Sequence, residues 1–275
     1  MKRDFSVCMS VYKNDKPAEV AVALDSVINQ SVRPAEIVLV VDGPIPDALN
    51  SVLDEFSEKY VDLFNIIRLT ENKGLGNALK LAIEAANYEL VARMDSDDIC
   101  MPGRFEKQLA CFEQDPDLSI VGGTISEFID TSDNVVGHRV CPLTNEDIRE
   151  YMKSRCGFNH MTVMFRKSEV LRVGNYQDWF WNEDYYLWIR MMLAECRFAN
   201  LSDTLVNVRV GKDMYARRGG WKYFKSEAGI QRYMWKHDVI GLGRYLYNVA
   251  IRFVLQVVMP NSLRGWFFRT FARKQ

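Results

Sequence analysis

Three carboxylates stand within four residues at Asp95-Ser96-Asp97-Asp98. They follow residues 88–94, which we predict to form a buried strand. Carboxylates this close repel one another, and a divalent cation would offset the repulsion, since Mg²⁺ and Mn²⁺ prefer oxygen ligands of this kind. Protein-bound Mg²⁺ usually contacts substrate phosphates as well, so the cluster indicates an enzyme that handles a nucleoside diphosphate through a metal. A solvated turn is the alternative, because Asp and Ser are ordinary turn residues.

The first hundred residues alternate between strand-like and helix-like segments. Apolar residues at helical spacing predict helices that begin near Pro17, Leu49 and Leu75. This βαβαβαβ series predicts an α/β fold whose mainly parallel, Rossmann-like sheet carries helices on both faces. The predicted strands are 5–11, 36–41, 65–69 and 88–94.

Polar residues follow the ends of these strands. In sheets of this kind, ligands bind beyond the carboxyl ends of the strands. Tyr12, Asp42, Asn72 and Asp95 each come just after such an end. We therefore expect four positions that are far apart in the sequence to converge at one edge of the sheet.

The composition is that of an ordinary globular protein, with 48% hydrophobic and 26% charged residues in a chain of 275. A net charge of −1 argues against a protein that coats nucleic acid, so no nucleic-acid partner is expected. The six cysteines include no CxxC pair, which disfavours zinc and fits reduced thiols in the cytosol. The sequence shows no signal-peptide pattern and no run of 18 apolar residues, so neither a leader nor a transmembrane helix is expected.

Two common nucleotide-binding motifs do not occur. A dinucleotide-binding fold needs a glycine-rich turn after its first strand, and residues 12–15 contain no glycine. The pair Gly74 and Gly76 is followed by Leu79 where a third glycine would stand. No GxxxxGK[ST] loop is present, which argues against a P-loop NTPase.

Five motifs instead resemble those of family 2 glycosyltransferases, in the order and spacing of that family, over residues 5 to about 110. A later element, residues 182–188, resembles the Glu-Asp element on the acceptor side of these enzymes. The resemblance implies a GT-A fold, in which a nucleotide-binding α/β half is fused to an acceptor-binding half. The five motifs are Ser6-Val7-Cys8-Met9-Ser10-Val11-Tyr12, Ser26-Val27-Ile28-Asn29-Gln30-Ser31, Val40-Val41-Asp42-Gly43, Asn72-Lys73-Gly74-Leu75-Gly76-Asn77-Ala78 and Ala92-Arg93-Met94-Asp95-Ser96-Asp97-Asp98.

The resemblance implies roles for the residues that would bind a UDP-sugar donor. Val11 and Tyr12 would line the base pocket, and Asp42 would accept a hydrogen bond from uracil N3–H. Lys73 and Gly74 would lie near the base or the diphosphate. The alternatives are a turn residue for Asp42 and an ordinary loop before a helix for Lys73 and Gly74.

The resemblance also divides the acidic cluster between donor and metal. Asp97 would bind Mn²⁺ or Mg²⁺ directly, while Asp95 would contact the ribose or a metal-bound water and so belong to both sites. Ser96 would contact the donor. Asp98 would cap the following segment toward Arg104.

On the acceptor side, the resemblance makes Asp184 the candidate catalytic base. An inverting transfer needs one carboxylate to remove the acceptor hydroxyl proton. Glu183, His160 and Trp181 would contact the acceptor. The alternatives are an acidic first helical turn for residues 183–184, a structural role for His160 and core packing for Trp181.

A basic loop and a basic tail complete the set of predictions. Arg217 and Arg218 resemble a loop that covers the diphosphate, since Arg suits phosphate; a solvated loop is the alternative. From residue 239 to the end there is no acid and a charge of +6, with a polar stripe at four-residue steps on an apolar helix over 245–259. We expect the tail to bind an anionic membrane surface; the alternative is a helix packed on the domain with a basic outer face.

The resemblance is strongest to bacterial O-antigen and exopolysaccharide transferases. It implies transfer of galactose or glucose from a UDP-sugar, β1→3, to GlcNAc-diphosphoundecaprenol, a lipid-linked sugar diphosphate acceptor. The enzyme would be cytoplasmic and peripheral on the inner face of the bacterial inner membrane. We expect a nucleotide-sugar-binding half at 1–110, an acceptor-binding half at 111–238 and a basic amphipathic extension at 239–275.

Three other functions are compatible with parts of the pattern. A sugar-nucleotide nucleotidyltransferase would need a glycine-rich basic loop after the first strand, which Lys13-Asn14-Asp15 does not provide. A non-catalytic membrane scaffold of an assembly complex would not need both Asp97 and Asp184. A processive synthase would be expected to carry transmembrane helices and a QxxRW motif.

Overall fold

The computed structural model describes residues 4–211 and 219–259. Arg217, Arg218 and the end of the C-terminal tail from residue 260 onward lie outside the described residues, so the predictions made for them are not addressed by the structure.

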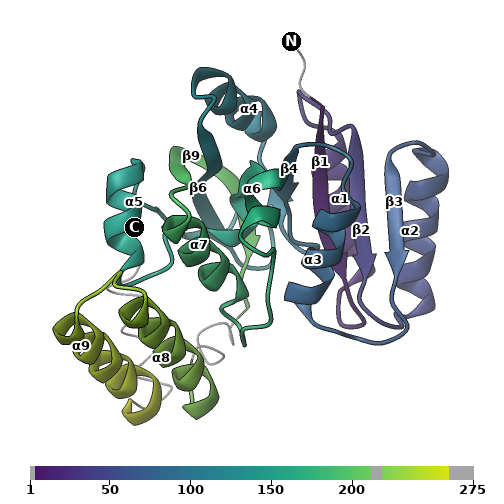
Figure 1. Cartoon of the computed structure of the whole chain (residues 1–275). Coiled ribbons are helices and arrows are strands. Elements are labelled where there is room, and N and C mark those ends of the chain that lie inside the picture. The colour runs from purple at the N-terminus through teal and green to yellow at the C-terminus, as the bar shows by residue number, and fades with distance from the viewer. Residues whose placement is uncertain (1–3, 212–218, 260–275) are drawn as a thin grey trace.

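A single sheet of nine strands forms the centre of the described structure (Figure 1). Its order is β3-β2-β1-β4-β8-β6-β9-β5, and β7 pairs with β6 outside this path. The strands are β1 (Phe5–Val11), β2 (Glu36–Val41), β3 (Phe64–Arg68), β4 (Leu90–Arg93), β5 (Ile99–Cys100), β6 (Leu118–Phe128), β7 (Val135–Arg139), β8 (Met164–Arg166) and β9 (Arg197–Arg209).

The predicted parallel sheet is confirmed for the first four strands, since β2 pairs in parallel with β1 and β3, and β1 with β4. Strand β8 lies between β4 and β6 and is antiparallel to both. Strands β4 and β6 therefore run in the same direction. Strands β6 and β9 then run parallel, with antiparallel β5 at the far edge. The fold is the expected α/β type, with antiparallel strands inserted in its second half.

Helices cover both faces of the sheet, as predicted. Helices α1, α2 and α4 pack on one face, whereas α3 and α5 to α8 contribute to the core on the other. The helices are α1 (Pro17–Ile28), α2 (Asp47–Lys59), α3 (Leu75–Ala85), α4 (Arg104–Gln114), α5 (Asn145–Met152), α6 (Lys167–Arg172), α7 (Glu183–Leu193), α8 (Trp221–Lys236) and α9 (Leu242–Phe253).

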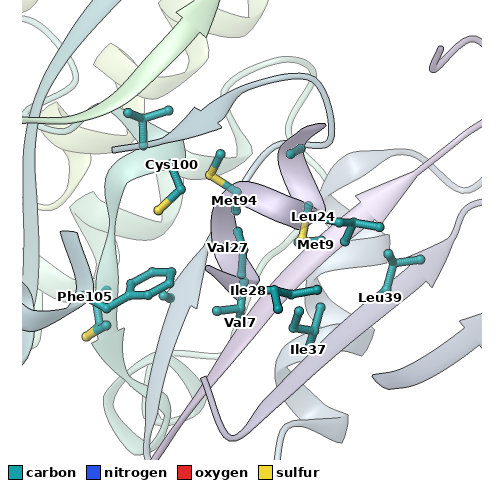
Figure 2. Close-up of a cluster of buried hydrophobic side chains, with 14 of the residues drawn as sticks. Val7, Met9, Leu24, Val27, Ile28, Ile37, Leu39, Met94, Cys100 and Phe105 are labelled. Carbon is teal, nitrogen blue, oxygen red and sulfur yellow. The ribbon is translucent and has the colours of Figure 1, made fainter. Parts of the chain in front are cut away.

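The alternation of side chains along the central strands produces two cores. Val7 and Met9 of β1 point toward α1, where Figure 2 shows them beside Leu24 and Val27. Cys8, between them in sequence, points to the opposite core, with α3 and α7. Because the central strands are buried on both faces, their sequences are nearly continuous apolar runs. Burial of each such aliphatic side chain contributes about 1.5 to 3 kcal/mol.

The predicted C-terminal helix is present as α9 and a short π-helical turn, η3 (Val254–Val258). Helices α8 and α9 form a hairpin at the end of the molecule opposite α2 (Figure 1). The polar stripe of α9, at Asn248, Arg252 and Gln256, faces the protein, and its apolar side faces outward. The outer face is thus apolar, where the packed-helix alternative predicted a basic one. Within the described part of the chain, no helix combines the length and apolarity needed to cross a bilayer.

Candidate active site

Asp15 joins the loop that follows the carboxyl end of β1 to the loop that follows the carboxyl end of β4. Its Oδ2 accepts hydrogen bonds from Tyr12 N at 3.1 Å and from Ser96 Oγ at 2.8 Å. Desolvation by burial raises the pKa of Asp15, and the nearby charge of Asp95 raises it further. The predicted convergence of Tyr12 and the acidic cluster is therefore found, with Asp15 as the residue that holds them together.

The loop after β2 is joined to the start of α3 by Asp42, which is buried. Its Oδ1 accepts from Lys73 N at 2.7 Å, while its Oδ2 accepts from Gly74 N at 2.9 Å and Asn72 Nδ2 at 2.9 Å. A Cβ on Gly43, whose φ is +85°, would lie 2.6 Å from Asn72 N. The turn therefore needs glycine so that the two loops can approach.

Asp95 is held by the arginine two residues before it. Nη1 and Nη2 of Arg93 both donate to the Asp95 carboxylate, the first to Oδ2 at 2.7 Å. The Arg93 side chain is only 3% exposed, whereas that of Asp95 is 26% exposed. The carbonyl of Arg93 accepts from Arg104 Nη2 at 2.7 Å, so a second buried arginine fixes the end of β4. The Asp95 side chain is thus fixed by Arg93 and remains partly exposed to solvent.

The two remaining acids of the cluster have different surroundings. Asp97 is exposed, yet desolvation of its carboxyl group and the charges of Asp95 and Asp15 raise its pKa to about 6. Asp98 is buried, and its Oδ1 accepts from Arg209 N of β9 at 2.9 Å. The prediction that Asp98 caps toward Arg104 was wrong, because Asp98 accepts from the last residue of β9 and α4 has no side-chain cap.

The carboxylates of Asp95 and Asp97 suit a divalent cation that is bound together with substrate phosphates. Crowded acids whose pKa values are raised gain from a nearby positive charge. Among the described residues, no group of three or more His, Cys, Asp or Glu side chains could hold a metal alone. Mg²⁺ is commonly bound by one or two carboxylates plus phosphates, so this donor set fits such an ion.

On the acceptor side, Glu183 and Asp184 form the first turn of α7. A Cβ on Gly76, in the first turn of α3, would meet the Cβ and Cγ atoms of Glu183 at 3.3 Å. The first turn of α3 therefore lies close to the first turn of α7. Desolvation raises the pKa of Glu183 to about 7, and the charge of Asp184 adds to the shift.

The Asp184 carboxylate is surrounded by groups that the sequence did not connect with it. Its Oδ1 accepts from Tyr185 N at 2.7 Å, and its Oδ2 lies 3.8 Å from Cys156 Sγ and 3.9 Å from His160 Nδ1. The other ring nitrogen of His160 lies 2.6 Å from the hydroxyl of buried Tyr176. Burial raises the pKa of Asp184 and lowers that of His160 well below its usual value, so His160 is neutral at pH 7.

Arg93 is the cation between the two groups of carboxylates. It pairs with Asp95 on the donor side, and its charge opposes the burial-driven rise in the pKa values of Glu183 and Asp184 on the acceptor side. It also lowers the pKa of His160, after burial. The residues predicted for the donor and those predicted for the acceptor are therefore both influenced by the charge of one buried guanidinium group.

The remaining predicted residues are placed as follows. Val11 is fully buried in the core, so its side chain does not face a base pocket. Tyr12 is 40% exposed at the end of β1, and Lys73 is exposed beside the Asp42 loop. Trp181 is 53% exposed and stacks on Phe180 rather than in the core.

Sequence reasoning missed four residues of this site, namely Asp15, Arg93, Cys156 and Tyr176. Arg93 lies inside a recognised motif, and a charged residue on an otherwise apolar central strand was a signal that needed a partner. Asp15 follows the first strand by four residues and fits the same edge-of-sheet argument as Tyr12. Nothing in the sequence placed Cys156 or Tyr176 near residue 184.

Comparison with known proteins identifies the family of the chain. The sequence matches Glycosyl transferase family 2 over residues 6–179. This match covers more than half of the chain and includes the donor-side loops and the acidic cluster. The chain therefore belongs to glycosyltransferase family 2, and its fold is GT-A.

Two curated relatives and one solved structure refine this assignment. The amylovoran biosynthesis glycosyltransferase AmsE of Erwinia amylovora is 40% identical over 83% of this chain and 84% of its own. An Escherichia coli UDP-Gal:alpha-D-GlcNAc-diphosphoundecaprenol beta-1,3-galactosyltransferase is 34% identical over 98% of this chain and 97% of its own. The mannosyltransferase PcManGT of Pyrobaculum calidifontis, solved with GDP-Man and Mn²⁺, shares the fold with a TM-score of 0.64 at 16% identity, over 100% of this chain and 77% of its own.

Proposed function

We propose that this protein is an inverting glycosyltransferase that moves one hexose, galactose or glucose, from a UDP-sugar to a lipid-linked acceptor. The acceptor that we favour is GlcNAc-diphosphoundecaprenol, with a β1→3 linkage, in the assembly of an O-antigen or another polysaccharide. The E. coli relative, which is named for this donor, acceptor and linkage, supports the proposal because it aligns with nearly the whole chain.

The observation that carries the proposal is the presence of two pairs of carboxylates near Arg93. Asp95 and Asp97 lie on the donor side, and Glu183 and Asp184 lie at the start of α7. A transfer between two bound substrates needs charge stabilisation of the leaving group on one side and proton removal on the other. The same residues are not needed by a protein that only binds.

In the proposed reaction, the acceptor hydroxyl oxygen attacks the anomeric carbon from the side opposite the nucleotide. The new carbon–oxygen bond forms as the bond from that carbon to the UDP oxygen breaks, so the configuration at the carbon inverts. Asp184 takes the hydroxyl proton, and burial, which raises its pKa, makes it a stronger base than an ordinary aspartate. Glu183, His160 and Trp181 would bind and orient the acceptor sugar.

On the donor side, Asp42 keeps acceptor capacity on Oδ1, which receives only one hydrogen bond, and would use it for uracil N3–H. Tyr12, Lys73, Gly74 and Ser96 would contact the nucleotide. Asp95 and Asp97 would hold Mn²⁺ or Mg²⁺. When bound, the metal supplies positive charge that stabilises the departing diphosphate.

We further propose that the enzyme works as a peripheral protein at the cytoplasmic face of a bacterial inner membrane. A lipid-linked sugar diphosphate presents its reactive sugar at such a surface, and the residues 239–275 are rich in cations and apolar side chains. The division into a donor half at 1–110, an acceptor half at 111–238 and this extension remains part of the proposal.

The experiment that tests the proposal is a donor screen with purified protein, Mn²⁺ or Mg²⁺, and a synthetic GlcNAc-diphosphate-lipid. We expect the product to gain the mass of one hexose from UDP-galactose or UDP-glucose, and EDTA to abolish the gain. Transfer from neither donor would contradict the proposed substrates. Failure of every nucleotide sugar, with the acceptor still bound, would favour the non-catalytic scaffold.

A further inference from the structure

Helix α9 and the turn η3 point their apolar side chains away from the protein. Leu246 is 57% exposed, Tyr247 is 64% exposed and Val254 is 50% exposed. A helix on the surface of a domain normally buries its apolar stripe and exposes its polar one. In α9 this arrangement is reversed. The other exposed apolar side chains of this segment are Leu242, Ile251, Phe253 and Val258.

Buried polar contacts fix this orientation of α9. Asn248 Nδ2 donates to Gln231 Oε1 at 2.7 Å and to the carbonyl of Lys153 at 3.0 Å. Arg252 pairs with Glu227 of α8, and both side chains are less than 15% exposed. Rotation of the helix to hide its apolar side would leave these groups buried without partners, which is costly. The outward apolar face is therefore a stable feature of the fold.

Helix α8 supplies positive charge beside this face. Lys225, Arg232 and Lys236 are exposed and stand seven and four residues apart, so they share one side of the helix. Residues 221–253 carry six Lys or Arg and two acids, a net charge of +4. Two of these cations, Arg244 and Arg252, are already paired with protein carboxylates, so the accessible charge is that of α8.

Two tryptophans connect the basic side of α8 with the apolar side of α9. Trp221 is 53% exposed, and its ring lies 6.4 Å from that of Phe253. Trp235 is 37% exposed and stacks on Tyr245 at 5.3 Å. Exposed Trp beside Lys and Arg and a row of aliphatic side chains is the composition of a surface that lies in a membrane interface.

We infer that the outward side of the α8–α9 hairpin docks on an anionic lipid bilayer; the inference rests on the proposed function, in which the acceptor is lipid-linked. We call it the hairpin surface, and it comprises the exposed side chains of α9 and η3 with Trp221, Trp235 and the α8 cations. A bilayer of acidic lipid suits both parts of this surface, because its acyl region accepts the apolar side chains and its headgroups attract the cations. A second copy of the chain would bring like charges together in a symmetric contact, and residues 260–275 would add four more cations and no acid.

The test is co-sedimentation of the full chain with vesicles of phosphatidylcholine and phosphatidylglycerol, without donor or acceptor. The double variant Leu246→Glu/Val254→Glu should lose at least tenfold in vesicle affinity. The variant Lys225→Glu/Arg232→Glu should lose more than tenfold on acidic vesicles, because each cation near such a surface contributes about fivefold. Wild-type binding should also weaken as salt is raised.

The control Lys59→Glu/Val61→Glu makes the same kind of change at exposed positions on α2 and the turn after it. Its binding should equal that of the wild type, and circular dichroism should show all variants folded. The inference would be overturned if the wild-type protein did not co-sediment with acidic vesicles, or if the hairpin variants bound them as well as the control does. So would a wild-type dimer that Leu246→Glu/Val254→Glu converts to a monomer without a change in vesicle binding.

This experiment separates the surface from the proposed chemistry, because no step of it needs catalysis. Activity is measured apart, with a short-chain acceptor that stays in solution. The hairpin variants should keep that activity while they lose vesicle binding. An inactive wild type that still binds vesicles through the hairpin surface would refute the proposed function and leave the surface in place.

Discussion

At the scale of single residues, Asp97 is repelled by Asp95 and Asp15 in the metal-free protein. Asp97→Asn should therefore raise the melting temperature in EDTA by about 2 °C, equivalent to about 1 kcal/mol in a chain of this size once screening by solvent is allowed for. The same variant should lose the stabilisation that Mn²⁺ gives the wild type. Thermal denaturation with and without Mn²⁺ measures both effects. Asp117→Asn, at an exposed position away from the site, should change neither.

The pKa of Glu183, raised from 4.5 to about 7, makes the folded protein bind a proton that the unfolded chain has released. The contribution of Glu183 to the free energy of unfolding is therefore fully present below about pH 4.5 and is lost as the pH rises through 7. Glu183→Gln should be near neutral at pH 4 and should stabilise by about 1 to 2 kcal/mol at pH 8. Urea unfolding at the two pH values measures the difference. A stabilisation that is equal at both would contradict the raised pKa.

Asp184 and Glu183 are adjacent acids, and kinetics can distinguish the proposed base from its neighbour. Asp184→Asn should keep UDP binding but lower kcat by about 100-fold or more, because general-base catalysis contributes about 10² to 10⁴-fold. It should also remove the acid limb of the pH–rate profile, which reports protonation of the base. Glu183→Gln should mainly raise KM for the acceptor and retain that limb. The opposite pattern would assign the base to Glu183.

The residues that sequence reasoning found and those that it missed differ in a physical way. Asp42 and Asp95 follow strand ends, and the rule that ligands bind at that edge was enough to select them as candidates, whereas the metal role of Asp97 came from the resemblance to the family. Asp15 satisfies the same rule, but Tyr12, three residues earlier, was selected from this loop instead. Cys156 reaches Asp184, and Tyr176 reaches His160, only through tertiary packing, which no local spacing encodes.

At the scale of elements, the turn at Gly43 sets the distance between the loop after β2 and the start of α3. Gly43→Ala would place a methyl group 2.6 Å from Asn72 N and would also strain a φ of +85°. The loop must move, so we expect loss of about 2 kcal/mol in stability and at least tenfold weaker UDP binding, measured by calorimetry. Gly103→Ala has a similar φ of +74° with no atom within 4 Å, so it should lose stability but keep UDP binding.

The elements that the sequence predicted well are those with buried, uninterrupted patterns. Strands β1 and β2 were predicted with the bounds that they have, because both are buried on two faces and end at polar turns. The segment 161–165 is mostly apolar, yet only its end is a strand, because the chain forms a 3₁₀ turn at His160–Thr162 before β8. The antiparallel place of β8 between β4 and β6 depends on pairing partners 43 and more residues away, which periodicity does not specify.

At the scale of the whole molecule, the sheet joins the two halves that the sequence suggested. Strand β5, from the first hundred residues, pairs with β9 at the far edge, and β4 pairs with β8. Both cores also draw on both halves. For the C-terminal hairpin, the sequence showed which residues of α9 share a side but not which side faces the protein. That choice was decided by buried partners on α8, such as Gln231, and by backbone carbonyls just after α5.

If buried polar contacts hold the hairpin in this orientation, removal of one should loosen it without disturbing the donor site. Arg252 pairs with Glu227 where both are nearly buried, so Arg252→Ala leaves an unpaired charge and should destabilise α9 by about 3 kcal/mol. Arg244 pairs with Glu150 where both are more than a third exposed, so Arg244→Ala should cost less than about 1 kcal/mol. Hydrogen exchange of the α9 amides should therefore accelerate by about 100-fold in the first variant and by less than about fivefold in the second. UDP binding should be unchanged in both, and equal exchange rates would show that apolar contacts such as Phe224 with Phe253 hold the hairpin instead.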